Sequence, residues 1–132
     1  METEIKSTTS SNLPDEIIEM KLEKVSEIIG GTILQASHSS GDFTTAFASD
    51  LMSDVLRFQM EDTVLITGLC TIQAIRTAEM SNISCIVFVR NKRVTEDMLK
   101  LAKENHIAVI VAESTMYEVS GKLYQGGLEP IY

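Results

Sequence analysis

Apolar and polar residues alternate in blocks over the second half of the chain. From residue 63 onward, short runs that are apolar at every position alternate with segments in which apolar residues recur every three or four positions. Runs that are apolar at every position are typical of strands in a parallel sheet. The periodic segments are typical of helices that cover both faces of such a sheet. This pattern predicts the order βαβαβα with right-handed crossovers. The predicted strands are 64–66, 85–89 and 107–111, and the predicted helices are 71–80, 96–105 and 115–125.

The first half of the chain is less regular. Ile18, Leu22, Val25 and Ile29 lie at helical spacing and predict a helix that ends at the glycine pair 30–31. Its beginning stays open, because Pro14 followed by two acids is a helix-opening pattern, whereas residues 17–22 also fit a short strand. Further strands are predicted at 32–35 and 44–48, and the second leads to a short helix capped by Ser49 or Asp50.

The chain length of 132 residues predicts one domain with a single core. Residues 1–14 are polar and rich in serine and threonine, so we expect a flexible tail, followed by a single domain over residues 15–132. The expected fold class is α/β, as a three-layer α/β/α sandwich with a mostly parallel, mixed sheet.

The composition narrows the class of protein. The chain is 44% hydrophobic and carries a formal net charge of −8, which repels phosphate backbones and anionic lipids. We therefore expect neither nucleic acid nor membrane as a partner. The beginning of the chain shows no apolar signal segment, and the expected location is cytoplasmic.

Residue types that carry catalysis are sparse. Cys70 and Cys85 stand in separate apolar segments without CxxC spacing, and two thiols cannot supply the four ligands of an ordinary iron–sulfur cluster. His38 and His106 are isolated in the sequence. Cys70 precedes a helix, where the dipole lowers a thiol pKa, so a thiol-dependent enzyme is one alternative. The preferred interpretation has buried free thiols, no catalytic residue, no metal site and no cofactor.

Candidate binding residues follow two neighbouring predicted strands. The carboxyl ends of parallel strands meet at one edge of a sheet, which is where ligands bind in open α/β folds. A glycine and hydroxyl groups at a helix start suit an anion such as phosphate, and a basic run falls on the same edge. The alternatives are a helix cap at Thr71 and a solvated basic loop. The candidate residues are Thr67, Gly68, Thr71, Arg90, Lys92 and Arg93.

Three acids form a second candidate group. Asp50 and Asp54 stand four positions apart on one predicted helix face, and Asp42 lies upstream across the preceding strand. Three carboxylates can bind Mg²⁺ or a basic partner side chain, and capping or solvation of a surface helix explains them equally well.

The last predicted helix carries two apolar stripes, which need two partners. One stripe covers the sheet, and the other predicts contact with a second subunit, where a glycine allows close approach; an exposed tyrosine pair is the alternative. The first stripe contains Met116, Val119 and Leu123, and the second contains Tyr117, Gly121 and Tyr124.

From residues 20 to 124 the chain resembles the DRTGG domain, which is itself similar to the N-terminal domain of HPr kinase/phosphorylase. The residues that carry the resemblance include the segment 49–55, which reads Ser-Asp-Leu-Met-Ser-Asp-Val where the family usually has D-L-L-S-D-V. Segments 20–22, 64–68, 86–89 and 117–124 also stand in the expected places. The resemblance implies a three-layer fold like that of the HPr kinase N-terminal domain.

The signature that names the family is altered here. Asp42 matches its aspartate and Thr44 or Thr45 its threonine, but Phe43 replaces the arginine and residues 46–47 replace the two glycines. A bulky Phe47 limits the approach of this backbone to a ligand, so the resemblance implies the fold more than the ligand.

The family resemblance also implies a function. DRTGG modules are non-catalytic regulatory domains attached to phosphotransacetylases and nucleotide-sensing pyrophosphatases. We therefore expect a regulatory or ligand-sensing module that binds a nucleotide or another phosphate-bearing small molecule, works as a homodimer and has an enzyme partner. The alternative is an interaction adaptor for an iron-only hydrogenase or another redox complex, because stand-alone relatives commonly carry such labels.

Overall fold

A computed structural model describes residues 18–38 and 41–132. The predicted tail, residues 1–14, and the proposed helix start at Pro14 lie outside the described residues. Within them the chain forms a six-stranded sheet in the order β1-β5-β4-β3-β2-β6. The strands β2 to β6 run parallel to their neighbours, and β1 pairs antiparallel with β5. The strands are β1 (Thr32–Gln35), β2 (Thr45–Ala48), β3 (Thr63–Thr67), β4 (Cys85–Phe88), β5 (Ala108–Val111) and β6 (Glu129–Pro130).

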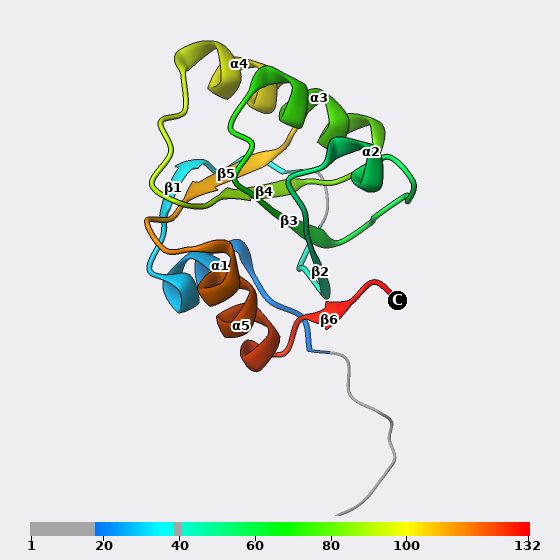
Figure 1. Cartoon of the computed structure of the whole chain (residues 1–132), viewed down its shortest axis with the longest axis vertical. Coiled ribbons are helices and arrows are strands. Elements are labelled where there is room, and N and C mark those ends of the chain that lie inside the picture. The colour runs from blue at the N-terminus through cyan, green and yellow to red at the C-terminus, as the bar shows by residue number, and fades with distance from the viewer. Residues whose placement is uncertain (1–17, 39–40) are drawn as a thin grey trace, which may run out of the picture.

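Helices cover both faces of this sheet, as Figure 1 shows. Two helices lie on one face: α1 (Leu22–Ile29) and α5 (Met116–Gly126). The other face carries α2 (Met52–Val55), α3 (Ile72–Met80) and α4 (Glu96–Glu104). The three-layer α/β/α sandwich with a mostly parallel, mixed sheet is therefore confirmed. None of the helices in the described part of the chain is long and apolar enough to span a bilayer.

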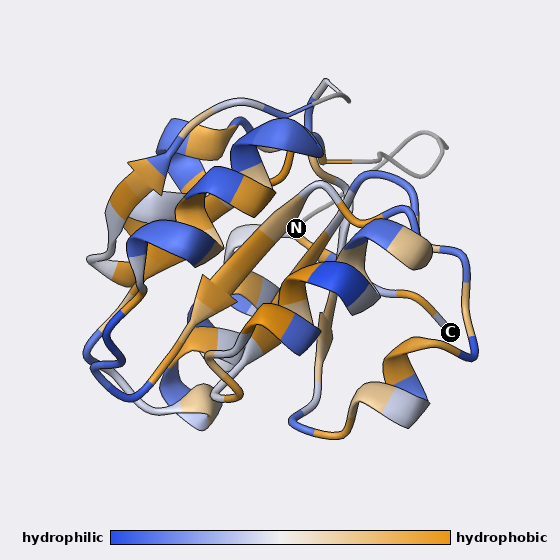
Figure 2. Ribbon diagram, turned by 90° about the horizontal axis from the view of Figure 1, so that it is seen from above, coloured by the Kyte–Doolittle hydropathy of each residue, from blue (hydrophilic) through white to orange (hydrophobic). Residues whose placement is uncertain are grey.

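The core is split into two clusters because successive strand residues point to opposite faces of the sheet. Val64 and Ile66 pack with α1 and α5, whereas Leu65 of the same strand packs with α2, α3 and α4. All five residues of β3 and all four of β4 are buried, as the continuous apolar runs predict. Figure 2 shows these central strands as hydrophobic, with polar bands on the outer sides of the helices.

Helix boundaries follow from local capping chemistry. Thr71, Thr95 and Thr115 precede α3, α4 and α5, and each hydroxyl accepts a hydrogen bond from the backbone N–H three residues later. Gly30 ends α1 in the left-handed conformation with a φ of 66°, which glycine adopts without steric cost.

Two segments resolve what the pattern left open. α1 begins at Leu22, because Met20 forms an isolated antiparallel bridge with Phe43 through two backbone hydrogen bonds of 2.7 Å. This extended stretch fits the short-strand alternative better than a helix that includes Ile18. At the other end of the chain, for which the sequence analysis makes no prediction, β6 pairs with β2 and forms an edge of the same sheet.

Candidate functional site

The loops that follow β2, β3 and β4 converge on the carboxylate of Asp50. Its Oδ1 accepts hydrogen bonds from the backbone N–H of Gly68 at 2.6 Å and from the hydroxyl of Thr67 at 3.2 Å. Its Oδ2 accepts one from the guanidinium of Arg90, at 3.1 Å. Four of the predicted residues thus form one connected cluster at the carboxyl edge of the sheet, which we call the Asp50 cluster.

Backbone geometry places Arg90 in this cluster. Arg90 and Asn91 have φ values of 69° and 57°, in the left-handed region that turns the chain sharply after β4. The turn is held by hydrogen bonds from the Arg90 N–H to the Ser114 carbonyl at 2.9 Å and from the Asn91 N–H to the Ala112 carbonyl at 3.0 Å. Arg90 therefore reaches back toward β3 and β2.

The Arg90 side chain lies close against the backbone of Gly68. A Cβ built on Gly68 would overlap the guanidinium of Arg90. The planar guanidinium thus lies directly against the backbone whose N–H also binds Asp50. The sequence analysis predicts that Gly68 lets a ligand approach the backbone, and in the structure the group that lies there is the side chain of Arg90.

The donors of the cluster stabilise the ionised form of Asp50. The Gly68 N–H holds the pKa of Asp50 below its ordinary value against the opposing effect of burial, with further contributions from Arg90 and Thr67. The side chains of Arg90 and Asp50 are 41% and 49% exposed, so solvent reaches both partners of the ion pair. The same three donors that stabilise a carboxylate also match phosphate oxygens.

A polar pocket of about 410 Å³ lies on the other side of the Arg90 turn. Asn91 and residues 111–114 line it from the sheet edge, and Gly30 and Thr32 line it from the end of α1 and the start of β1. Lys122 also lines it and pairs with Glu118 at 3.0 Å. Because Arg90 and Asn91 are adjacent, the Asp50 cluster and this pocket share one turn of backbone.

The remaining basic and hydroxyl residues lie beside the cluster. The Thr71 hydroxyl caps α3 by accepting the Ala74 N–H at 3.2 Å, as the capping alternative predicts. Lys92 and Arg93 are exposed in the loop before α4, where the Arg93 carbonyl accepts from the Cys70 thiol at 3.5 Å. The loop that carries the basic run therefore contacts the turn that follows β3.

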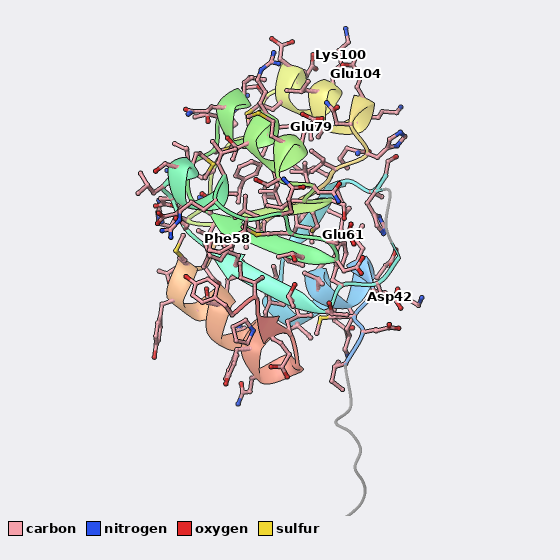
Figure 3. The ribbon with its side chains drawn as sticks, turned by 90° about the vertical axis from the view of Figure 1, so that its right-hand side faces the viewer. Asp42, Phe58, Glu61, Glu79, Lys100 and Glu104 are labelled. Carbon is pink, nitrogen blue, oxygen red and sulfur yellow. The ribbon has the colours of Figure 1, made fainter. Side chains whose placement is uncertain are left out.

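The three predicted acids do not come together. Asp42 precedes β2, whereas Asp50 follows it, so the strand separates them. Asp42 instead pairs with Lys21 at 3.3 Å, and Figure 3 shows it on the same side of the molecule as Glu61, which precedes β3. Asp54 lies in the first turn of α2. Across residues 18–38 and 41–132, no group of three or more His, Cys, Asp or Glu side chains is arranged to hold a metal ion.

Neither Ser49 nor Asp50 caps α2, which corrects a sequence-based expectation. The residue that precedes the helix is Leu51, whose N–H is accepted by the Ser49 hydroxyl at 2.9 Å. The Asp50 side chain instead points to Gly68. There the Gly68 N–H and the Arg90 guanidinium both donate hydrogen bonds to its carboxylate, which stabilise it more than a single helix N–H would.

The cysteines do not resemble catalytic thiols. Burial raises the pKa of the Cys70 thiol, and the nearby charge of Lys92 only partly opposes that shift. This is opposite to the lowering that the helix start predicts. Cys85 is fully buried in β4, which raises the pKa of its thiol still further. Both cysteines are free; Cys85 is buried as the sequence predicts, whereas Cys70 is only partly buried.

An apolar pocket of about 340 Å³ lies between α5 and the strands β2, β3 and β6. Tyr117, Gly121 and Tyr124 line it, and the two tyrosines are 89% and 71% exposed. The second stripe predicted for the last helix therefore faces this pocket and solvent. Sequence reasoning missed the pocket, because the β6 residues that complete it are far away in the sequence.

Comparisons with known proteins support the fold. No family model and no curated protein sequence matches the chain. A solved structure does: the CBS and DRTGG domains of the regulatory region of Clostridium perfringens pyrophosphatase, complexed with its activator diadenosine tetraphosphate. The TM-score is 0.70 at 14% sequence identity, and the match covers 85% of this chain and 48% of that one. At this identity the likeness shows that the chain has a fold present in that regulatory region, which confirms the expected DRTGG-like α/β architecture.

Proposed function

We propose that this chain is a non-catalytic regulatory module that senses a phosphate-bearing small molecule at the carboxyl edge of its sheet. The observation that carries the proposal is the convergence of an amide, a hydroxyl and a guanidinium on one carboxylate, that of Asp50. These are the donors with which proteins bind phosphate oxygens. Here Asp50 occupies the position of the anion.

Binding then works by exchange. A phosphate group that takes the guanidinium of Arg90 and the N–H of Gly68 displaces the carboxylate of Asp50. Asp50 immediately precedes Leu51 and α2, so its release alters the segment that joins β2 to α2. This change alters the surface that an enzyme partner contacts, and so signals ligand binding without a catalytic step.

The solved neighbour supports a regulatory role. That structure is a regulatory region in complex with an activator, diadenosine tetraphosphate, which contains phosphate groups. This chain matches about half the length of that chain.

Isothermal titration tests the proposal with inorganic phosphate, ATP and diadenosine tetraphosphate as probes. We expect Arg90→Gln to weaken the binding of all probes that bind the wild type by at least about tenfold, since a charged hydrogen bond is lost. Asp50→Asn removes the internal competitor and its negative charge, so we expect tighter binding. The control is Arg76→Gln, which removes the same charge from the exposed side of α3.

The opposite signs of the two variants distinguish ligand binding from a structural ion pair. A structural role predicts that both variants lower stability and that neither changes binding. If every probe is silent up to about millimolar concentration, where binding is worth only about 4 kcal/mol, the phosphate-sensing proposal is wrong and a protein-interaction role remains.

A further inference from the structure

On one face of the sheet, the helices stop short of the β6 edge. Figure 1 shows α5 lying between α1 and β6, and within residues 18–38 and 41–132 no other helix covers this end of the face. The apolar pocket of about 340 Å³ lies there, lined by Ala46 and Ala48 of β2 and by Pro130 of β6. We call this pocket, together with the exposed side of α5 that borders it, the α5–β6 face.

Two large aromatic side chains border the pocket without filling it. Tyr117 and Tyr124 line it from α5, yet they are 89% and 71% exposed. Gly121 lies between them on the same side of the helix, and a Cβ built there would have no atom within 4 Å. An exposed apolar area of this kind marks a contact with another molecule, and the open space at Gly121 lets a second helix approach the backbone closely.

The α5–β6 face is complementary to itself. It carries a protruding pair of aromatic rings and an apolar hollow, side by side. In a contact with twofold symmetry the same patch lies on both sides, so each protruding group must find its hollow on an identical copy. The tyrosines of one copy can occupy the pocket of another, and the reverse contact follows from the symmetry. A different partner would have to supply its own matching rings and hollow.

The charges of this face also favour a second copy. The whole chain carries a formal net charge of −8, so most approaches of two copies are repulsive. On α5 the charged residues are Glu118 and Lys122, which pair with each other at 3.0 Å. Of the residues that line the pocket, Glu129 alone is charged. The face therefore adds little to the repulsion between copies, and it offers no acidic cluster that would select a basic partner.

The exposed area suits a dimer. A tyrosine side chain buries about 150–250 Å² when it is covered, so the two exposed rings offer roughly 250–400 Å² per copy. A stable dimer buries about 800 Å² per copy, of which the rings supply about a third to a half. Exposed residues around the pocket add to this area, and they are Ala48, Gly121, Glu129 and Pro130.

We infer that two copies of this chain associate through their α5–β6 faces, with the tyrosines of each copy in the apolar pocket of the other. The two α5 helices cross near Gly121, which lies close to the twofold axis because it stands between the tyrosines. The sequence pattern predicts a second subunit on this stripe of α5, and the pocket beside β6 defines how the two copies fit together. The contact does not involve the Asp50 cluster, so it is independent of the proposed function.

Sedimentation equilibrium over a range from about micromolar to several hundred micromolar protein tests the association. We expect the wild-type chain to shift from monomer to dimer as its concentration rises. Gly121→Glu suits a helix better than glycine and places two like charges at the axis, so it should raise the dimer dissociation constant at least about tenfold. Gln73→Glu is the matched control, because it adds the same charge to α3 on the opposite face of the sheet and should leave association unchanged. Circular dichroism checks that both variants fold.

Cross-linking locates the axis. In a Cys70→Ser background, Gly121→Cys should form a disulfide between copies in air, since such a bond needs Cα atoms within about 7 Å, whereas Gln73→Cys should not. A chain that stays monomeric at every concentration overturns the inference. So does a dimer that Gly121→Glu leaves intact and Gly121→Cys does not cross-link, because that dimer uses another surface. Arg90→Gln should dimerise like wild type, so a failure of phosphate sensing leaves this result unchanged.

Discussion

At the scale of single residues, Asp50 has the largest consequences. Its carboxylate joins the ends of β2, β3 and β4 through Gly68, Thr67 and Arg90. The pair with Arg90 is half exposed, and exposed ion pairs contribute only about 0–1 kcal/mol to stability. The Arg90 pair therefore contributes little to the stability of the fold, and the hydrogen bond from the Gly68 N–H is the main interaction that favours the ionised form of Asp50.

The pH dependence of stability tests the role of Asp50. Folding lowers the pKa of this carboxyl from its ordinary value of 3.8, chiefly through the Gly68 N–H. The stabilising contribution is therefore complete above that ordinary value and is lost as the pH falls through the lower pKa of the folded state. We expect the difference in free energy of unfolding between wild type and Asp50→Asn, from urea denaturation, to shrink as the pH falls below about 4.

Asp54→Asn is the matched control for this measurement, because it removes the same charge four residues away. If the stability difference between wild type and Asp50→Asn stays constant across the acid range, then Asp50 does not stabilise the folded state through its ionised form.

At the scale of elements, threonine hydroxyls set where helices begin. Thr71, Thr95 and Thr115 all cap helices on the carboxyl side of the sheet, each by the same hydrogen bond. Only Thr71 was also a candidate ligand contact in the sequence, because it follows Gly68 closely. Its hydroxyl is already used by the Ala74 N–H, so the structure explains this residue without a ligand.

A pair of variants separates capping from binding at Thr71. We expect Thr71→Ala and Thr95→Ala each to lower the free energy of unfolding by about 1 kcal/mol, the usual cost of a lost cap. Chemical denaturation measures this effect. Titration with the probe that wild-type protein binds most tightly should show the same affinity for both variants. A selective loss of affinity in Thr71→Ala would restore Thr71 as a ligand contact.

At the scale of the whole molecule, stability is uneven across the sheet. β3 and β4 are flanked by parallel strands on both sides and buried on both faces. β6 is a two-residue edge strand, both of whose residues are exposed. The apolar pocket has one wall in this edge, and we expect this wall to open more easily than the central strands.

Hydrogen exchange tests this gradient. The Glu129 N–H, bonded to the Thr44 carbonyl at 3.0 Å, should exchange by local opening, while the amides of Leu65 and Ile86 should exchange only on global unfolding. Amide exchange followed by NMR at increasing urea distinguishes the two, because only global opening depends strongly on denaturant. Equal urea dependence at Glu129 and Leu65 would show that β6 unfolds with the core.

Much of this architecture was predictable from local pattern. The buried runs that became β3, β4 and β5 and the periodic segments that became α3, α4 and α5 appear at nearly the predicted positions. Their apolar spacing has one low-energy solution, a sheet covered on both faces. The edge that holds Thr67, Gly68 and Arg90 followed from the same pattern, since parallel strands end together.

Tertiary structure decided the contacts between these segments. Asp50 binds the end of β3 instead of capping α2, and its partner Arg90 is placed by a left-handed backbone conformation. Arginine rarely adopts this conformation, so the sequence does not indicate it. The pocket under α5 depends on the pairing of β6 with β2, two strands that lie near opposite ends of the domain sequence. Periodicity along a chain encodes which face is buried, whereas the meeting of distant side chains depends on how the layers pack.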